Sequence, residues 1–311
     1  MTVASQPVFF IGDVALDEYY QAPYWPAIKE KIIVQPLLAQ HGGMIANAAC
    51  VYAGYGGQAQ FLGMLNPGDI SQRLITELKR QKVEVQHIVF EPTLPDAKTM
   101  VFITENEHTV LIPTLGIQRF PIPQITLHAL QNAAAIYTNL VEFKPLICGS
   151  FQALDILKHL RQKGVRIIFD LDVDGIADED FEYIPLIDVG IFNEIGFKHQ
   201  AKGLEEERAA DTLLSAGMEM IVITKGANGC AVYSSQGKKV IPGLPVKVID
   251  VTGAGDTFGA SFLYGLEQWG EISKAASFAT AAAARSVESM GARSGVASLL
   301  EVMAFWANHK S

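Results

Sequence analysis

The chain has 311 residues, of which 49% are hydrophobic and 18% are charged, and its formal net charge at pH 7 is −9. That length and apolar content suffice for one large α/β domain, with or without an appendage. The acidic balance and the lack of Lys/Arg-rich runs argue against nucleic acid as a partner.

The cysteines and the first residues point to the cytoplasm. Three cysteines lie far apart, and the seven histidines form no metal-binding motif, so reduced thiols are expected. The beginning, MTVASQPVFFIGDV, lacks the basic region and long apolar core of a signal peptide. Residues 32–68 carry no Asp, Glu, Lys or Arg but contain seven glycines, so we expect no membrane partner.

Continuous apolar runs alternate with helical patterns along most of the chain. Strands covered on both faces give such runs, and βα alternation predicts a parallel sheet. We therefore expect an α/β fold with a doubly wound, mainly parallel sheet flanked by helices. The expected strands are 8–14, 59–65, 134–140, 165–172, 188–193 and 219–226, and the expected helices are 44–54, 69–81, 150–162 and 205–216.

Two extended regions, 16–42 and 96–118, interrupt this alternation, and the second resembles a hairpin that turns at 105–107. They predict a small β-sheet lid, although edge strands of the main sheet are an alternative. The main domain would then comprise 1–15, 43–95 and 119–311. A sheet of two or three strands exposes an apolar face, so we expect a homodimer formed through the lid.

The pattern changes after residue 226. Three closely spaced runs, 230–235, 238–243 and 246–250, are typical of an antiparallel meander. Three helices, 255–269, 272–289 and 297–306, are expected to follow.

The segment DVTGAGDTFGASFLYGL, residues 250–266, places a glycine turn at the start of an apolar helix. Exposed N–H groups and the helix dipole make this a credible phosphate or oxyanion site. Neither a P-loop nor a dinucleotide motif fits, because no Lys follows Gly255 and Gly259 comes one residue late. Asp256 is either an acid that stabilises the first helical turn or a general base beside a transferred phosphoryl group.

This segment closely resembles the C-terminal signature of the ribokinase-like (PfkB) carbohydrate kinases, DTxGAGDxFxxGF, with Val251 in place of a common Thr. The resemblance implies that Asp256 is the catalytic base. It also implies that Gly253, Ala254, Gly255 and Asp256 form an anion hole and that ATP and Mg²⁺ take part in the reaction.

Residues 42–57, GGMIANAACVYAGYGG, contain a glycine pair, Gly42 and Gly43, that would let a polyol approach the backbone. Asn47 could bind hydroxyls, or it could face solvent beside an ordinary turn. The stretch resembles the family's di-glycine signature, GGxxxN. Two acids, Asp13 and Asp17, follow Gly12 at the end of the first strand, where a parallel sheet meets its ligands. The family implies that Asp17 contacts sugar hydroxyls, and Glu142 matches a second such acid more loosely.

The turn of ITKGANGCAVY, residues 223–233, is either a hairpin or part of a nucleotide site. The resemblance implies nucleotide contacts at Thr224 and Gly226, with Gly229 in the same turn. Thr280 stands in an Ala-rich helix, 276–287, where the family usually has Asn, and this helix could leave a slot for adenine.

One departure concerns magnesium. In the family an NxxE motif supports the ion; Asn193 matches, but Gly196 stands in place of the Glu, which predicts weaker or altered magnesium dependence. The family also uses backbone oxygens near Asp250 and Thr252, together with a later Gly-Ala segment such as 291–293, for a monovalent cation, so K⁺ is a further expectation.

The sequence thus predicts an ATP-dependent kinase acting on a hydroxyl of a small sugar of the ribose or fructose type. A nucleoside kinase and a sugar-phosphate kinase are alternatives; the latter would need cations such as Lys29, Lys31 or Lys98 in the lid. A catalytically silent sugar- or nucleotide-binding regulator is a further alternative.

Overall fold

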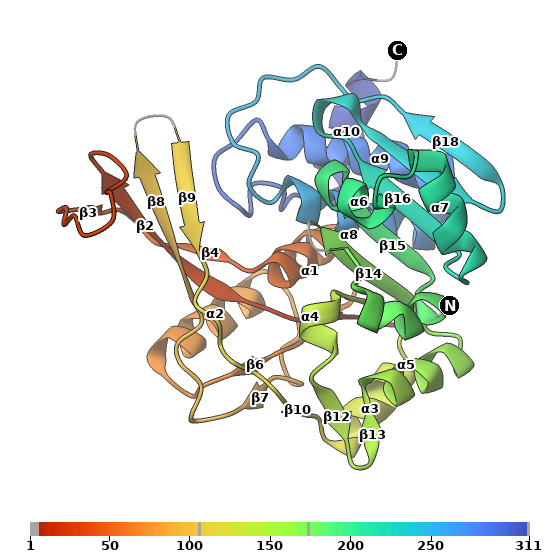
Figure 1. The fold of residues 1–311 in the computed structure, drawn as a ribbon, viewed down its shortest axis with the longest axis horizontal. Coiled ribbons are helices and arrows are strands. Elements are labelled where there is room, and N and C mark those ends of the chain that lie inside the picture. Colours follow the sequence, from red (N-terminus) through yellow and green to blue (C-terminus); the bar gives the residue numbers. More distant parts are fainter. Residues whose placement is uncertain (1–5, 105–106, 173–174, 310–311) are drawn as a thin grey trace.

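An eight-stranded sheet forms the centre of the computed structural model, which describes residues 6–104, 107–172 and 175–309 (Figure 1). The six strands from β16 to β5 are parallel, whereas β17 and β18 are antiparallel additions at one edge. In spatial order the strands are β18 (Gly237–Ile241), β17 (Cys230–Ser234), β16 (Met220–Thr224), β15 (Val189–Asn193), β14 (Arg166–Asp172), β11 (Ala135–Thr138), β1 (Val8–Ile11) and β5 (Ala59–Leu62).

The expected doubly wound sheet is confirmed, and β1 shows why its apolar runs are continuous. Alternate side chains of a strand point to opposite faces, so Val8 and Phe10 enter one core cluster while Phe9 and Ile11 enter the other. Both faces are buried under helices. One core contains α1 (Met44–Gly54), α2 (Asp69–Arg80), α8 (Ala254–Trp269), α9 (Ile272–Ser286) and α10 (Leu299–Asn308).

The opposite core is covered by shorter helices, several of which the sequence patterns did not predict. Within the described residues, no helix is long and apolar enough to cross a bilayer. The helices of this second core are α3 (Gln124–Gln131), α4 (Leu140–Phe143), α5 (Ala153–Gln162), η1 (Asp178–Leu186), α6 (Glu194–Ala201) and α7 (Glu206–Ser215).

A second sheet is built from the two regions that interrupt the βα alternation, and it is separate from the central sheet. The expected hairpin is present, since β8 and β9 are antiparallel, but its turn at 105–106 lies outside the described residues. Figure 1 shows this sheet projecting from the body of the molecule. Its strands are β2 (Ala15–Ala22), β3 (Gln35–Pro36), β4 (Gln40–Gly42), β8 (Lys98–Thr104) and β9 (Glu107–Leu111).

The expectation of a third meander strand at 246–250 was wrong. The chain from 242 to 249 forms no strand: Pro242 and Pro245 at its start have no N–H to donate, and 246–250 pairs with no strand of the sheet. The segment instead lines a cavity, as described below. The remaining short elements are β6 (Met64–Leu65), β7 (Val89–Phe90), β10 (Phe120–Pro121), β12 (Leu146–Cys148), β13 (Phe151–Gln152) and η2 (Gly226–Asn228).

Candidate active site

The glycine turn before α8 requires glycine at its first position. Gly253 has φ 75°, and a Cβ there would lie 2.0 Å from the carbonyl oxygen of Ala292. A side chain is therefore excluded both by the backbone conformation and by the neighbouring chain. Gly255 differs, because a Cβ there would meet nothing within 4 Å. The first turn of α8 consequently has open space beside its backbone.

This turn is where the expected anion hole would lie, and its N–H groups are not equivalent. The N–H of Ala254 donates to the carbonyl oxygen of Val251 at 3.2 Å, so it is already used within the turn. Gly255 and Asp256 follow it in the first helical turn, whose N–H groups have no acceptors within the helix. These two residues therefore offer the better donors for an anion.

Gly259, the late glycine of the motif, has a packing role. A Cβ at this position would lie 2.1 Å from the hydroxyl oxygen of Tyr137. That hydroxyl donates to Asp170 Oδ2 at 2.6 Å within the buried interior. This glycine therefore lets α8 approach β11 closely.

Asp256 lies in the first turn of α8 and is held by a side chain from another helix. Asn47 Nδ2, in α1, donates to Asp256 Oδ2 at 2.9 Å. Burial raises the pKa of Asp256 well above its ordinary value, and the charges of nearby acids, chiefly Asp170, add to the rise. The Asn47 hydrogen bond opposes this shift by favouring the ionised form. The carboxyl group is thus a stronger base than an exposed aspartate.

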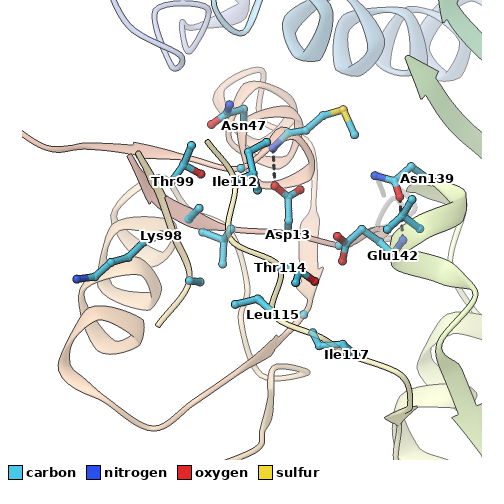
Figure 2. A pocket seen from close by; sticks show the side chains of 18 of the residues that line it. Asp13, Asn47, Lys98, Thr99, Ile112, Thr114, Leu115, Ile117, Asn139 and Glu142 are labelled. Carbon is cyan, nitrogen blue, oxygen red and sulfur yellow. Dashed lines mark hydrogen bonds between the residues drawn. The ribbon is translucent and has the colours of Figure 1, made fainter. Parts of the chain in front are cut away.

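The first of two cavities has a volume of about 600 Å³ and lies between the central sheet and the second sheet. Figure 2 shows Asp13 between Asn47 and Glu142, with Thr99 and Lys98 on the side away from Glu142. The chain after β9, residues 112–117, forms another wall. Of the sequence-predicted residues, the cavity is lined by Asp13, Asp17, Gly43, Asn47, Glu142, Thr252, Gly253 and Asp256.

The glycine pair fixes how α1 enters this cavity. Gly43 is the N-cap of α1 and has φ 94°, and a Cβ on Gly42 would lie 2.1 Å from Asp17 Oδ2. Asp13 accepts hydrogen bonds from the backbone N–H groups of Met44 and Ile45, both at 3.1 Å. Asp13 therefore supports the start of α1, where a carboxylate is favoured by the helix dipole. Gly42 itself does not line the cavity.

Three carboxyl groups of this cavity have raised pKa values. Burial is the main cause for Asp13 and also for Asp17, whose pKa rises to about 6. Burial and then the charge of Asp13 raise the pKa of Glu142 to about 8. A carboxyl group with a pKa of about 8, as in Glu142, is largely protonated at neutral pH and can donate to a sugar hydroxyl, whereas ionised carboxylates only accept. The cavity is therefore suited to a polyhydroxylated ligand.

The second cavity, of about 490 Å³, lies on the other side of the glycine turn. Thr224, Gly226, Gly229 and Thr280 all line it, as do Val246 and Val248 from the segment first expected to be a strand. The Thr280 hydroxyl donates to the carbonyl oxygen of Ala276 at 2.9 Å, so the helix already uses this donor. Small side chains of α9, Ala283 and Ala284, leave room for a flat ring.

The two cavities meet at the first turn of α8. Thr252, Gly253 and Asp256 line the first cavity, whereas Val251, Ala254 and Gly255 line the second. A single turn of backbone therefore faces both ligand spaces. A group bound in one cavity could be transferred to a ligand in the other across this turn.

Asn193 does not line the second cavity. It caps α6, where its Oδ1 accepts from the backbone N–H of Gly196 at 2.7 Å. Its Nδ2 donates to Asp172 Oδ1 at 2.5 Å, and Asp172 lines the first cavity. The structure thus places Asn193 behind the first cavity. Gly196 lies in the first turn of α6 and is buried.

The loop of the expected monovalent-cation site is drawn together by Asp250. Its Oδ1 accepts from the backbone N–H and the hydroxyl of Thr252, and its Oδ2 accepts from the N–H of Gly291 at 2.8 Å. Burial tends to raise the pKa of Asp250, but these hydrogen bonds bring it below its ordinary value. Among the described residues, no group of three or more His, Cys, Asp or Glu side chains is arranged to hold a metal ion.

Sequence reasoning missed several residues of the site. Arg293 donates from Nε to Asn47 Oδ1 at 3.0 Å and from Nη2 to the carbonyl oxygen of Gly42 at 3.3 Å. Its neighbours 291–292 were noted only for their backbone, and no sequence motif marks a lone arginine. The sequence patterns assign Tyr137 and Asp170 only to strands, and they assign residues 112–117, which form a wall of the first cavity, only to the lid.

The pKa of Glu142 generates a stability prediction. The ordinary pKa of a glutamate is 4.5. Between pH 4.5 and pH 8, Glu142 therefore keeps its proton in the folded chain, whereas it has released the proton in the unfolded chain. The free energy of unfolding contributed by this group therefore falls as the pH rises through that window. Glutamine has no proton to release, so Glu142→Gln should not show this fall in the free energy of unfolding. We expect the unfolding temperature of the variant to rise relative to that of the wild type from pH 5 to pH 8.

The exposed Glu179 offers a control, because Glu179→Gln should leave the pH dependence of unfolding unchanged. A Glu142→Gln variant whose unfolding temperature follows the wild type in parallel across this window would contradict the prediction.

The chain is similar to known proteins along nearly its whole length. Residues 8–298 match the family described as pfkB family carbohydrate kinase. Ribokinase of Lactococcus lactis is 23% identical over 307 residues, which cover 96% of each chain. The structure of Arabidopsis thaliana ribokinase with ribose and ATP has a TM-score of 0.83, 20% identity and coverage of 97% of this chain and 99% of that one. A neighbour from Escherichia coli, solved with ATP and Mg²⁺, has a TM-score of 0.77 and 18% identity, and the match covers 98% of this chain and 100% of that one.

The family match spans nearly all of the chain, and the ribokinase-like fold is shown by both structural neighbours. Carbohydrate kinases are phosphotransferases with an alcohol group as acceptor. The protein belongs to the PfkB family of carbohydrate kinases.

Proposed function

We propose that this protein transfers the γ-phosphate of ATP to a hydroxyl group of a small neutral sugar of the ribose or fructose type. The observation that carries the proposal is the position of Asp256, at the one helical turn that faces both cavities. The neighbour solved with ribose and ATP supports the pairing of these two ligands.

The first cavity is the proposed acceptor site. Asp17, Asn47 and Glu142 offer donors and acceptors for hydroxyl groups, and Gly43 lets the sugar approach the backbone. The acidic residues disfavour an anionic acceptor. Lys98 is the only Lys or Arg among the described lining residues, and its Nζ lies 3.1 Å from Glu18 Oε1.

The second cavity is the proposed nucleotide site, and its shape fits that ligand. Gly226 has φ 51° with no neighbour for a Cβ within 4 Å, so the backbone is open to a ligand there. The apolar wall of Val246, Val248 and Phe258 suits an adenine ring. Magnesium would neutralise charge on the phosphates. K⁺ is proposed at the backbone oxygens of the Asp250 loop.

The proposed reaction uses Asp256 as general base. The carboxylate accepts the proton of the attacking sugar hydroxyl as the hydroxyl oxygen bonds to the γ-phosphorus; the bond from that phosphorus to the β–γ bridging oxygen breaks, and ADP leaves. The N–H groups of Gly255 and Asp256 stabilise negative charge on the phosphoryl oxygens. We propose that 16–42 and 96–118 act as a lid that excludes water from the acceptor cavity, which limits hydrolysis of ATP.

Asp256→Asn tests this mechanism. The variant retains size and the partner Asn47 but lacks the base, so we expect kcat to fall by about 10²–10⁴-fold. ATP binding, measured by calorimetry, should stay near the wild-type affinity, because Asp256 does not line the nucleotide cavity.

Asp69→Asn is the matched control, since Asp69 is also an acid in the first turn of a helix, α2. It should turn over ATP and sugar normally. If Asp256→Asn behaved like Asp69→Asn in both turnover and stability, Asp256 would be only a helix-stabilising acid.

The acceptor class is tested with a substrate panel. Lys29 and Lys31 are exposed and do not line the cavity, so a phosphate group on the acceptor would meet mainly carboxyl groups. We expect kcat/KM for ribose or fructose to exceed that for their phosphates by about 10²-fold or more, since uncompensated charge repulsion costs several kcal/mol. A preference for a sugar phosphate or a nucleoside would overturn the neutral-sugar assignment.

We also propose a homodimer formed through the second sheet. The sheet and its connections expose large apolar side chains: Trp25 51%, Ile28 94%, Ile33 93%, Leu38 87% and Ile112 76%. Large apolar side chains exposed to this extent are typical of protein–protein contact surfaces. Sedimentation should give about 68 kDa, twice the 33.8 kDa of the chain, and Leu38→Glu with Ile33→Glu should shift it towards monomer. A wild-type monomer at micromolar concentration would contradict this.

A further inference from the structure

Arg293 lies in the loop between α9 and α10, and its side chain is only 10% exposed. It reaches across to α1, where its Nε donates to Asn47 Oδ1 and its Nη2 donates to the carbonyl oxygen of Gly42. Its Nη1 is buried without a hydrogen-bond partner and lies 3.9 Å from Glu77 Oε1 in α2. Arg293 does not line either cavity, so it acts from behind the acceptor site.

The hydrogen bond from Arg293 sets the orientation of the Asn47 side-chain amide. An asparagine amide has an oxygen that accepts and a nitrogen that donates, and by itself it could present either to Asp256. A guanidinium group has only donors, so the amide oxygen must turn towards Arg293. The amide nitrogen is then directed at Asp256, with Nδ2 2.9 Å from Oδ2.

This orientation matters because Asp256 is surrounded by other acids. Asp13 follows β1, Asp170 and Asp172 lie in β14, and Tyr137 lies in β11; the charges of the three aspartates disfavour ionised Asp256. A donor aimed at the carboxylate favours ionisation, whereas an amide oxygen would oppose it. The positive charge of Arg293 also favours ionised Asp13 and Asp17.

Other ionisable groups face Arg293 from behind the site. Glu77 in α2 balances the guanidinium charge and is paired in turn with Arg80, whose Nε lies 2.7 Å from Glu77 Oε2. The positive charge of Arg293 also acts on His41 and Cys50, where it favours the neutral imidazole and the thiolate. Arg80 is therefore a useful comparison with Arg293. Both guanidinium groups lie beside Glu77, but in the described residues only that of Arg293 is hydrogen-bonded to the Asn47 amide.

We propose that Arg293 is a positioning residue for phosphoryl transfer: it locks the Asn47 amide so that its nitrogen donates to Asp256 and keeps that carboxylate in its proton-accepting form. The inference rests on the proposed role of Asp256 as base. Arg293 touches neither ligand space and contributes no atom to the reaction.

Arg293→Met tests the proposal, because Met fills similar space without a donor or a charge. Without Arg293 the amide can turn, the ionised form of Asp256 loses support, and the pKa of the base rises. A base must be ionised to act, so the acid limb of the kcat/KM profile should move to higher pH by about one unit. At neutral pH kcat should fall about tenfold with an unchanged KM for ATP.

Arg293→Lys should bring both the acid limb and kcat part of the way back to the wild type, since lysine also has only donors. Arg293→Gln should shift the acid limb as Arg293→Met does, because a second amide lets the Asn47 amide turn. Arg80→Met is the matched control and should keep the wild-type profile. If Arg293→Met does not fold, Arg293→Gln takes its place with the same expected shift.

An unshifted acid limb in the folded Met or Gln variant overturns the proposal, whether or not kcat falls, because a purely structural role would not move the limb. Asp256→Asn in the same assay separates the two ideas. If that variant keeps wild-type turnover, the proposed base is wrong. If it loses turnover while the Arg293 variants show no shift, only the positioning role is wrong.

Discussion

The hydrogen bond from Asn47 to Asp256 is the contact on which the proposed chemistry depends. It joins the first helix of the chain to a helix more than 200 residues later, and both helices begin at a glycine turn. A carboxyl group placed among Asp13, Asp170 and Asp172 would tend to keep its proton. The Asn47 donor opposes that tendency. Burial thus makes the carboxylate of Asp256, the proposed base, a stronger base, while the Asn47 hydrogen bond favours its ionised form.

Close packing explains why this arrangement tolerates few changes. Gly253 allows the turn to pass the carbonyl of Ala292, and Gly259 lets α8 settle against Tyr137. Gly42 leaves space for the carboxyl group of Asp17. Each glycine occupies a place where a methyl group would collide with backbone or with a buried polar group. The glycines thereby bring the two cavities to opposite sides of one helical turn.

Local patterns were enough to predict the layers of the fold. The run VFFI in β1 is buried on both faces, and such runs separated by helices gave the doubly wound parallel sheet. The same patterns failed at 246–250, where alternating valines suggested a strand but the segment pairs with no strand of the sheet. Val246 and Val248 line a cavity instead, and the apolar wall of a cavity can give the same alternation in the sequence as a strand.

Short segments were enough to predict which residues come together at the cavities, as 253–256 and Gly43 do. Contacts between distant segments could not be predicted in this way. Nothing in the residues around Arg293 indicates that its side chain reaches Asn47, because that distance depends on how α9 and α1 pack. Ala254 shows the same limit, since its N–H is taken up by Val251 in the folded turn.

The most direct test of this account is the titration of Asp256 itself. Carbon-13 NMR of the carboxyl group, assigned by comparison with Asp256→Asn, gives its pKa in the ligand-free protein. We expect a value above the ordinary range that coincides with the acid limb of kcat/KM for the sugar, since that limb reports the base of the free enzyme. A carboxyl group that titrates in the ordinary range of an exposed aspartate, away from that limb, would contradict the account.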